Sequence, residues 1–172
     1  MAKVAVVAAS DRVADALGRA LRASSVEHCA RAPHAPDDID ATAFEQFDSI
    51  VYAPSLVGGG SCSPDLTAAR DVAARLGAMP FKHAVVISSA AVYAADHQNV
   101  GLLKESAFIP QGRSALADAW REVERLTAFI GERSGTAPTR RAVLRPAAVL
   151  EGSDYFSRLL TGRFAVTYPG HD

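Results

Sequence analysis

Short apolar runs alternate with segments of helical periodicity along this chain, and this alternation limits the folds it can adopt more than any other feature. Residues 4–8, 48–53 and 84–89 are nearly continuous apolar runs, typical of strands that are covered on both faces. Between the first two, Val13, Leu17 and Leu21 recur at a spacing of four. Strands that alternate with helices predict a doubly wound α/β fold, a parallel sheet with helices on both faces.

The remainder of the chain continues this pattern. Further strands are predicted at 25–30 and 142–146, and helices from Ser63 to about Gly77, from Gln111 to Arg133 and from Tyr155 to Leu160. Ser63 is expected to cap its helix, with Pro64 in the first turn. Two prolines between 32 and 38 leave room only for a short strand around Ile39. The whole length, 1–172, is predicted to form a single domain.

Composition excludes several classes of function. The 18 Lys and Arg against 19 Asp and Glu give a net charge of −1, which removes the driving force for broad contact with nucleic acid or anionic lipid. No apolar run approaches the length of a membrane helix, so we expect no membrane span and a cytoplasmic protein. Cys29 and Cys62 form no CxxC motif, and the five histidines lack metal-ligand spacing. No metal site is therefore predicted.

Three separated motifs then point to a family. They are ISSAAVY at 87–93, AVLRPAAVL at 142–150, and the stretch 156–170 that ends in Tyr-Pro-Gly. Together they resemble the extended short-chain dehydrogenase/reductases, the NAD-dependent epimerase/dehydratase group, over nearly the whole chain. The resemblance implies a Rossmann fold that binds NAD or NADP, with catalysis by a Ser or Thr, a Tyr and a Lys. Extended members continue well past this last motif, so we expect a C-terminally truncated member whose substrate-binding portion is largely missing.

The family's glycine-rich turn, GxxGxxG, falls on Ala8, Asp11 and Ala14 in this chain. Its glycines permit the tight turn, the close approach of the diphosphate and the close packing of the helix. Ser10 and Asp11 are expected to cap the helix, and the carboxylate of Asp11 would repel a phosphate. We therefore predict that no cofactor binds. NADP is the first alternative, because Arg31 after the second strand could face a 2′-phosphate or could simply be a solvated side chain.

The triglycine Gly58–Gly60 is a weaker candidate. Its backbone amides could bind a phosphate, although such a stretch is more often a flexible loop.

The catalytic residues of the family are only partly present. Ser89 stands at the Ser or Thr position. If Glu124 is taken as the acid that commonly follows the family's lysine by four positions, Trp120 occupies the Lys position and Leu116 the Tyr position. No Tyr or Lys occurs between 111 and 141, so no other alignment restores the pair. Because neither Leu116 nor Trp120 can transfer a proton near neutral pH, Ser89 is predicted to be vestigial.

The sequence therefore predicts a non-catalytic module of this type, acting as a structural, partner-binding or regulatory subunit. The helix at 112–133 would contact a protein partner in a homo- or hetero-oligomer, because the resemblance implies a dimer interface there. Trp120 would either anchor that partner or fill the nicotinamide space. The alternative is an NAD(P)-dependent oxidoreductase- or epimerase-like enzyme of altered chemistry that uses Ser89 with Tyr93 or Tyr52.

Overall fold

A computed structural model describes residues 3–31, 39, 41–54, 63–93, 112, 114–130 and 139–146. Their elements in chain order are β1 (Lys3–Ala8), α1 (Asp11–Ala23), β2 (Glu27–Arg31), α2 (Ala41–Phe44), β3 (Ser49–Ala53), α3 (Leu66–Gly77), β4 (His83–Ile87), the 3₁₀ turn η2 (Ala90–Tyr93), α4 (Ala115–Leu126), the 3₁₀ turn η3 (Thr127–Phe129) and β5 (Arg140–Leu144). The predicted helix at 155–160, the triglycine and Cys62 lie outside the described residues. Ile39 is described but belongs to no strand.

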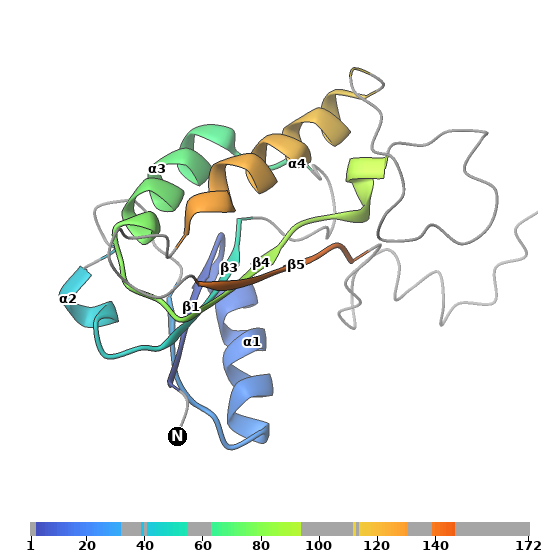
Figure 1. Cartoon of the computed structure of the whole chain (residues 1–172). Coiled ribbons are helices and arrows are strands. Elements are labelled where there is room, and N and C mark those ends of the chain that lie inside the picture. The colour runs from blue at the N-terminus through green and yellow to red at the C-terminus, as the bar shows by residue number, and fades with distance from the viewer. Residues whose placement is uncertain are drawn as a thin grey trace, which may run out of the picture.

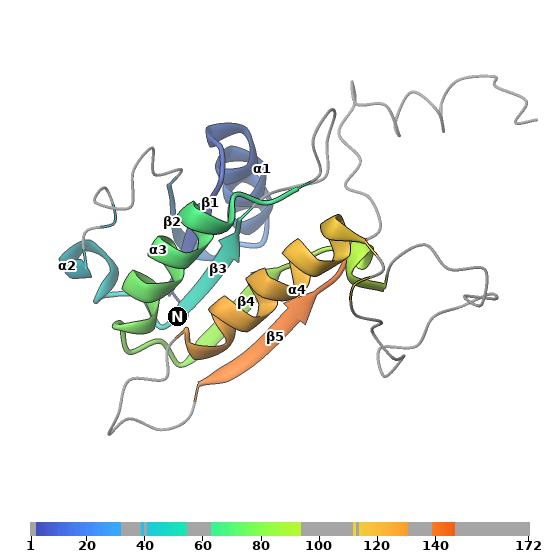
Figure 2. The same cartoon turned by 90° about the horizontal axis from the view of Figure 1, so that it is seen from above.

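The five described strands form one parallel sheet in the order β2-β1-β3-β4-β5. Helix α1 covers one face of this sheet, and α3 and α4 lie side by side on the other (Figures 1 and 2). The predicted doubly wound α/β fold is thus confirmed. The direction of winding changes between β1 and β3, and in open α/β sheets ligands bind beyond the carboxyl ends of the strands at such a point.

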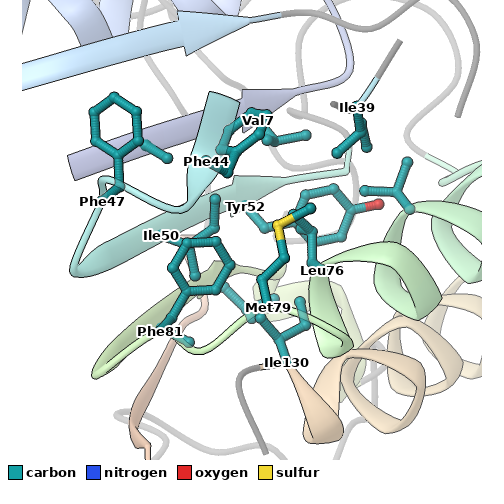
Figure 3. Packing of buried hydrophobic residues seen from close by; sticks show 14 residues of the cluster. Val7, Ile39, Phe44, Phe47, Ile50, Tyr52, Leu76, Met79, Phe81 and Ile130 are labelled. Carbon is teal, nitrogen blue, oxygen red and sulfur yellow. The ribbon is translucent and has the colours of Figure 1, made fainter. Parts of the chain in front are cut away.

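Apolar side chains alternate between the two faces of the sheet. The face under α3 carries the larger part of the core, which includes Val7, Ile50, Tyr52, Leu76 and Met79 (Figure 3). The face under α1 is lined by smaller side chains, among them the buried Ala8, Ala14, Ala53 and Ile87. Since each large apolar side chain contributes about 1.5–3 kcal/mol when fully buried, the α3 face holds most of the stabilising contacts.

The cap of α1 lies within the predicted pair Ser10 and Asp11, whereas the cap of α3 differs from the one predicted. The N-cap of α1 is Ser10, whose Oγ accepts from the Val13 amide at 3.4 Å, and Asp11 is the first helical residue. The N-cap of α3 is Asp65, which accepts from the amides of Thr67 and Ala68 at 2.9 and 3.0 Å. A carboxylate that accepts two amides is a stronger cap than the predicted Ser63, so α3 begins later.

The long helix predicted for 111–133 starts later and ends earlier in the structure. It begins at Ala115 because Ser114 caps it, and Gly112 before it has a φ of +70°. It ends at Leu126 and tightens into η3, where the Thr127 hydroxyl donates to the carbonyl of Val123 at 2.8 Å. The helical periodicity in the sequence continues past both ends, but these local hydrogen bonds set the limits.

Candidate functional site around the carboxyl ends of the strands

The four predicted cofactor positions lie around the carboxyl ends of β1 and β2. Ala8 ends β1, Asp11 begins α1, and Ala14 lies one turn further along that helix. Arg31 ends β2, where it is exposed and in register with Val7. The fold therefore brings these positions to the edge where a doubly wound sheet binds its ligands.

The side chains at the three glycine positions do not match the close diphosphate contact that glycines allow. Ala8 and Ala14 are 2% and 3% exposed, and their methyl groups pack with Ala53 in the small-residue core under α1. The exposed Asp11 adds a carboxylate at the N-terminus of α1, where a phosphate would need the free amides. The strand-turn-helix geometry of a nucleotide site is present, with the Asp11 carboxylate in the first turn of the helix.

Ser89, the predicted remnant of the catalytic set, is 2% exposed and directly follows the end of β4. Its Oγ accepts from the amide of Ala91 at 3.1 Å, so the hydroxyl caps η2. The Ser89 carbonyl also accepts from the Val92 amide at 3.2 Å. Both polar groups of Ser89 therefore have a local structural use.

Trp120 and Leu116 face the interior from α4. Trp120 is fully buried and packs with Val92 and Tyr93 of η2, and Leu116 is partly buried against the same cluster. The prediction that Trp120 anchors a protein partner is therefore wrong, because its ring has no exposed surface. It fills the space beside the turn that follows Ser89. The two side chains predicted for the Tyr and Lys positions thus both lie in the core.

A polar cluster that the sequence reasoning missed joins α4 to the ends of β4 and β5. Arg145 donates to both carboxylate oxygens of Glu124, each at 2.8 Å, and to the Tyr93 hydroxyl at 2.9 Å. The Ser88 hydroxyl donates to Glu124 Oε1 at 2.6 Å. The side chains of Glu124 and Arg145 are only 14% and 24% exposed. Their sequence separation and their positions on different elements hid this pair, although Arg145 lies in one of the three family motifs and Glu124 served to align the Tyr and Lys positions.

The charges in this cluster stabilise one another. Burial raises the pKa of the Glu124 carboxyl, but hydrogen bonds from Arg145 and Ser88 outweigh burial and leave that pKa below its ordinary value. The hydrogen bond to Glu124 likewise raises the pKa of the Arg145 guanidinium. Both groups therefore remain charged near neutral pH and hold η2 against α4.

Tyr52, the other tyrosine considered as an acid, lies in the core under α3. It is 3% exposed, and burial, with a smaller effect of the Asp65 carboxylate, raises the pKa of its phenol. A phenol with a raised pKa is a poor proton donor near neutral pH. Tyr52 is therefore a core residue in this fold.

Within the described part of the chain, His, Cys, Asp and Glu side chains form no group that could hold a metal ion. Among the same residues, none of the helices has both the length and the apolar character needed to cross a membrane.

No protein-family model matches the sequence, and no curated protein matches it. Solved structures do match the fold. MoeE5, in complex with UDP-glucose and NAD, has a TM-score of 0.64 and 17% identity over 92% of this chain. TunA, an NAD-dependent NDP-hexosamine 5,6-dehydratase, has a TM-score of 0.62 and 14% identity over 94%. A nucleoside-diphosphate sugar epimerase from Corynebacterium glutamicum has a TM-score of 0.61 and 18% identity over 84%.

This chain spans 60% of the MoeE5 chain, 62% of the TunA chain and 33% of the Corynebacterium chain.

These structures correct the cofactor prediction. We predicted that no cofactor binds, with NADP as the first alternative, but MoeE5 and a UDP-glucuronic acid 4-epimerase from Bacillus cereus are both complexes with NAD. The prediction gave too much weight to the three missing glycines, because proteins with this fold, MoeE5 among them, bind NAD. The positions that would hold it in this chain are Ala8, Asp11, Ala14 and Arg31. The chain has the fold of the extended short-chain dehydrogenase/reductases, the NAD-dependent epimerases and dehydratases.

Proposed function

We propose that this chain is a non-catalytic module of the short-chain dehydrogenase/reductase type that acts by binding another protein subunit. The observation that carries this proposal is the complete burial of Trp120, which occupies the position of the family's lysine. With Leu116 packed against the same cluster at the predicted tyrosine position, neither of these two positions offers a group that could move a proton to or from a sugar or nicotinamide.

The polar residues near this helix also support the proposal. The Ser89 hydroxyl already accepts the Ala91 amide, and the charges of Glu124 and Arg145 are directed at each other. A catalytic group needs a free lone pair or proton aimed at the substrate, whereas the Glu124 and Arg145 side chains direct theirs at each other and at the turn η2.

Activity assays test the catalytic half of the proposal. The protein would be incubated with NAD and either UDP-glucose or UDP-glucuronic acid, which are the sugar nucleotides of the MoeE5 complexes. We expect neither NADH absorbance nor a new sugar nucleotide above the protein-free blank, while an active epimerase assayed in parallel gives product. Turnover that rises with the concentration of this chain would contradict the proposal.

A pair of serine variants separates the alternative enzyme from a contaminant. If the chain were an enzyme that uses Ser89, Ser89→Ala would abolish such turnover, and the neighbouring Ser88→Ala would not. Turnover that both variants retain would indicate an impurity.

The partner would dock on the face formed by α3 and α4. A groove of about 330 Å³ lies there, lined by Arg70, Ala73, Ala74, Gly77, Leu126 and Phe129. Phe129 is 62% exposed at the rim of this groove. Small residues along α3 allow a second helix to approach closely, so the occupant we propose is another subunit of the same fold.

A cytoplasmic location stays a prediction.

A further inference from the structure

A second groove lies on the opposite side of the sheet, along the flank of α1 where this helix packs on β2. Its volume is about 430 Å³, within the range of small-molecule pockets. Its lining includes Asp15, Gly18, Arg19, Arg22, His28 and Ala30. Ala14, one of the four predicted cofactor positions, also lines the groove, which extends from there along α1 toward Arg22 and is separate from the α3 and α4 face.

The floor of this groove exists because residue 18 is glycine. Gly18 is buried in the middle of α1, and a Cβ there would lie 3.4 Å from His28 Nε2 and 3.5 Å from the Ala30 methyl group. A larger side chain would therefore fill the space between helix and strand. Glycine in a helix interior costs about 1 kcal/mol relative to alanine.

Two arginines form the helical wall. Arg19 and Arg22 are exposed, and neither side chain takes part in an ion pair or hydrogen bond within the described part of the chain. Asp15 is the one acid in the lining, so the two guanidinium groups leave the groove with a net positive charge. Arginine binds phosphate groups through paired hydrogen bonds, and an arginine without an internal partner keeps these donors available.

His28 supplies the opposite wall from β2. Its Nδ1 lies 2.9 Å from the carbonyl oxygen of Val26, and because a carbonyl only accepts, Nδ1 must carry the proton. This bond fixes the orientation of the ring and leaves Nε2 beside Gly18. When the ring is protonated, Nε2–H can donate to an anion in the groove while Nδ1–H stays with Val26.

We propose that this groove binds a small molecule through its phosphate group, held by Arg19 and Arg22 with His28 as a third donor. The class of ligand is a phosphomonoester or diphosphate. A neutral ligand would leave the positive charges of both guanidinium groups without a counter-charge.

An NMR titration with inorganic pyrophosphate at constant ionic strength tests the proposal. We expect saturable shifts of the Gly18 amide and the His28 ring at or below about 1 mM pyrophosphate. The double variant Arg19→Gln/Arg22→Gln should weaken binding at least about tenfold. The matched control is Arg70→Gln/Arg75→Gln, which removes the same charge from α3 on the other face and should bind as the wild type does.

A second pair of variants tests the shape of the groove. Gly18→Ala should weaken pyrophosphate binding by narrowing the floor, and Gly77→Ala, a helical glycine whose added Cβ would also meet its nearest neighbour at 3.4 Å, should not. The proposal is wrong if the wild type shows no saturable shift, if Arg19→Gln/Arg22→Gln binds as tightly as the wild type, or if the α3 control loses as much affinity. Thermal unfolding of each variant would show that it is folded.

Discussion

Arg145 holds Glu124 through two parallel hydrogen bonds, from Nε to Oε1 and from Nη2 to Oε2, each 2.8 Å long. This forked contact joins the end of β5 to α4, and the same guanidinium reaches the Tyr93 hydroxyl in η2. Charge-assisted bidentate pairs are among the strongest polar contacts in proteins, and this one is mostly shielded from water. It fixes η2 and the end of β5 to α4.

Glu124→Gln should lower the free energy of unfolding by about 2 kcal/mol at pH 7, because Arg145 would lose its buried counter-charge. The folded-state pKa of Glu124 lies below the ordinary value of 4.5, so the pair stabilises the fold above that pH. The difference between wild type and variant should therefore be full at pH 7 and shrink as the pH falls through the folded-state pKa. Urea unfolding at neutral and acidic pH measures this.

Glu122→Gln is the matched control on the same helix. Glu122 pairs with Arg125 at the surface, three residues away, so its loss should change stability little. Equal effects of the two variants, or a Glu124→Gln effect that does not depend on pH, would contradict the role assigned to the cluster.

Trp120 is the only tryptophan in the chain, so its fluorescence reports on its environment. Because the ring is fully buried, acrylamide should quench the native protein far less than the urea-unfolded protein. Trp120→Leu should lower the free energy of unfolding by about 3 kcal/mol, since it leaves a cavity beside Val92. Phe129→Leu, at an exposed position, should stay within about 0.5 kcal/mol of the wild type. Easy quenching of the native state would overturn the assigned packing.

Asp11→Asn should strengthen the binding of NAD by about tenfold, because it removes a carboxylate from the N-terminus of α1 without changing the size of the side chain. Asp15→Asn, one turn later on the same helix, should change the affinity much less. Isothermal titration calorimetry of the three proteins with NAD measures the effect. If Asp11→Asn and Asp15→Asn raise the affinity for NAD equally, the diphosphate does not approach the first turn of α1.

Phe129→Asp should weaken association through the α3 and α4 face, since it would place a charge in the proposed contact. The control is Leu144→Asp on β5, which changes the other large apolar residue that is exposed among those described. Sedimentation velocity over a range of concentrations would compare the two with the wild type. A wild type that stays monomeric alone and with a homologous subunit, or a larger loss from Leu144→Asp, would contradict the proposed interface.

The strands could be predicted because burial on both faces leaves a simple mark in the sequence. The apolar runs that contain Val6, Ile50 and Val86 form the central strands β1, β3 and β4, and these three side chains are buried. The edge strand and the short elements are harder to predict from the sequence. The strand β5 is predicted two residues too late, and the short helix α2 is not predicted at all. At these places fewer apolar residues mark the register, and hydrogen bonds to neighbouring elements decide where pairing begins.

The candidate site could be predicted only in part. The resemblance gave the positions of Ser89, Leu116 and Trp120, but it could not say that the Ser89 hydroxyl caps η2 or that the indole is fully buried. The Glu124–Arg145 pair depends on the crossover that brings β5 beside β4, which no local pattern contains. Contacts of this kind follow from topology, so they become visible only when the sheet order is known.

Arg145 follows α4 in the sequence, and this order affects how the chain folds during translation. The ribosome completes α4 before it adds this residue, so the carboxylate of Glu124 first emerges without its partner and must keep its own hydration shell. The guanidinium of Arg145 then joins Glu124 of α4 and the Tyr93 hydroxyl in one cluster. The moment at which β5 leaves the ribosome therefore sets when this edge of the nascent protein becomes fixed.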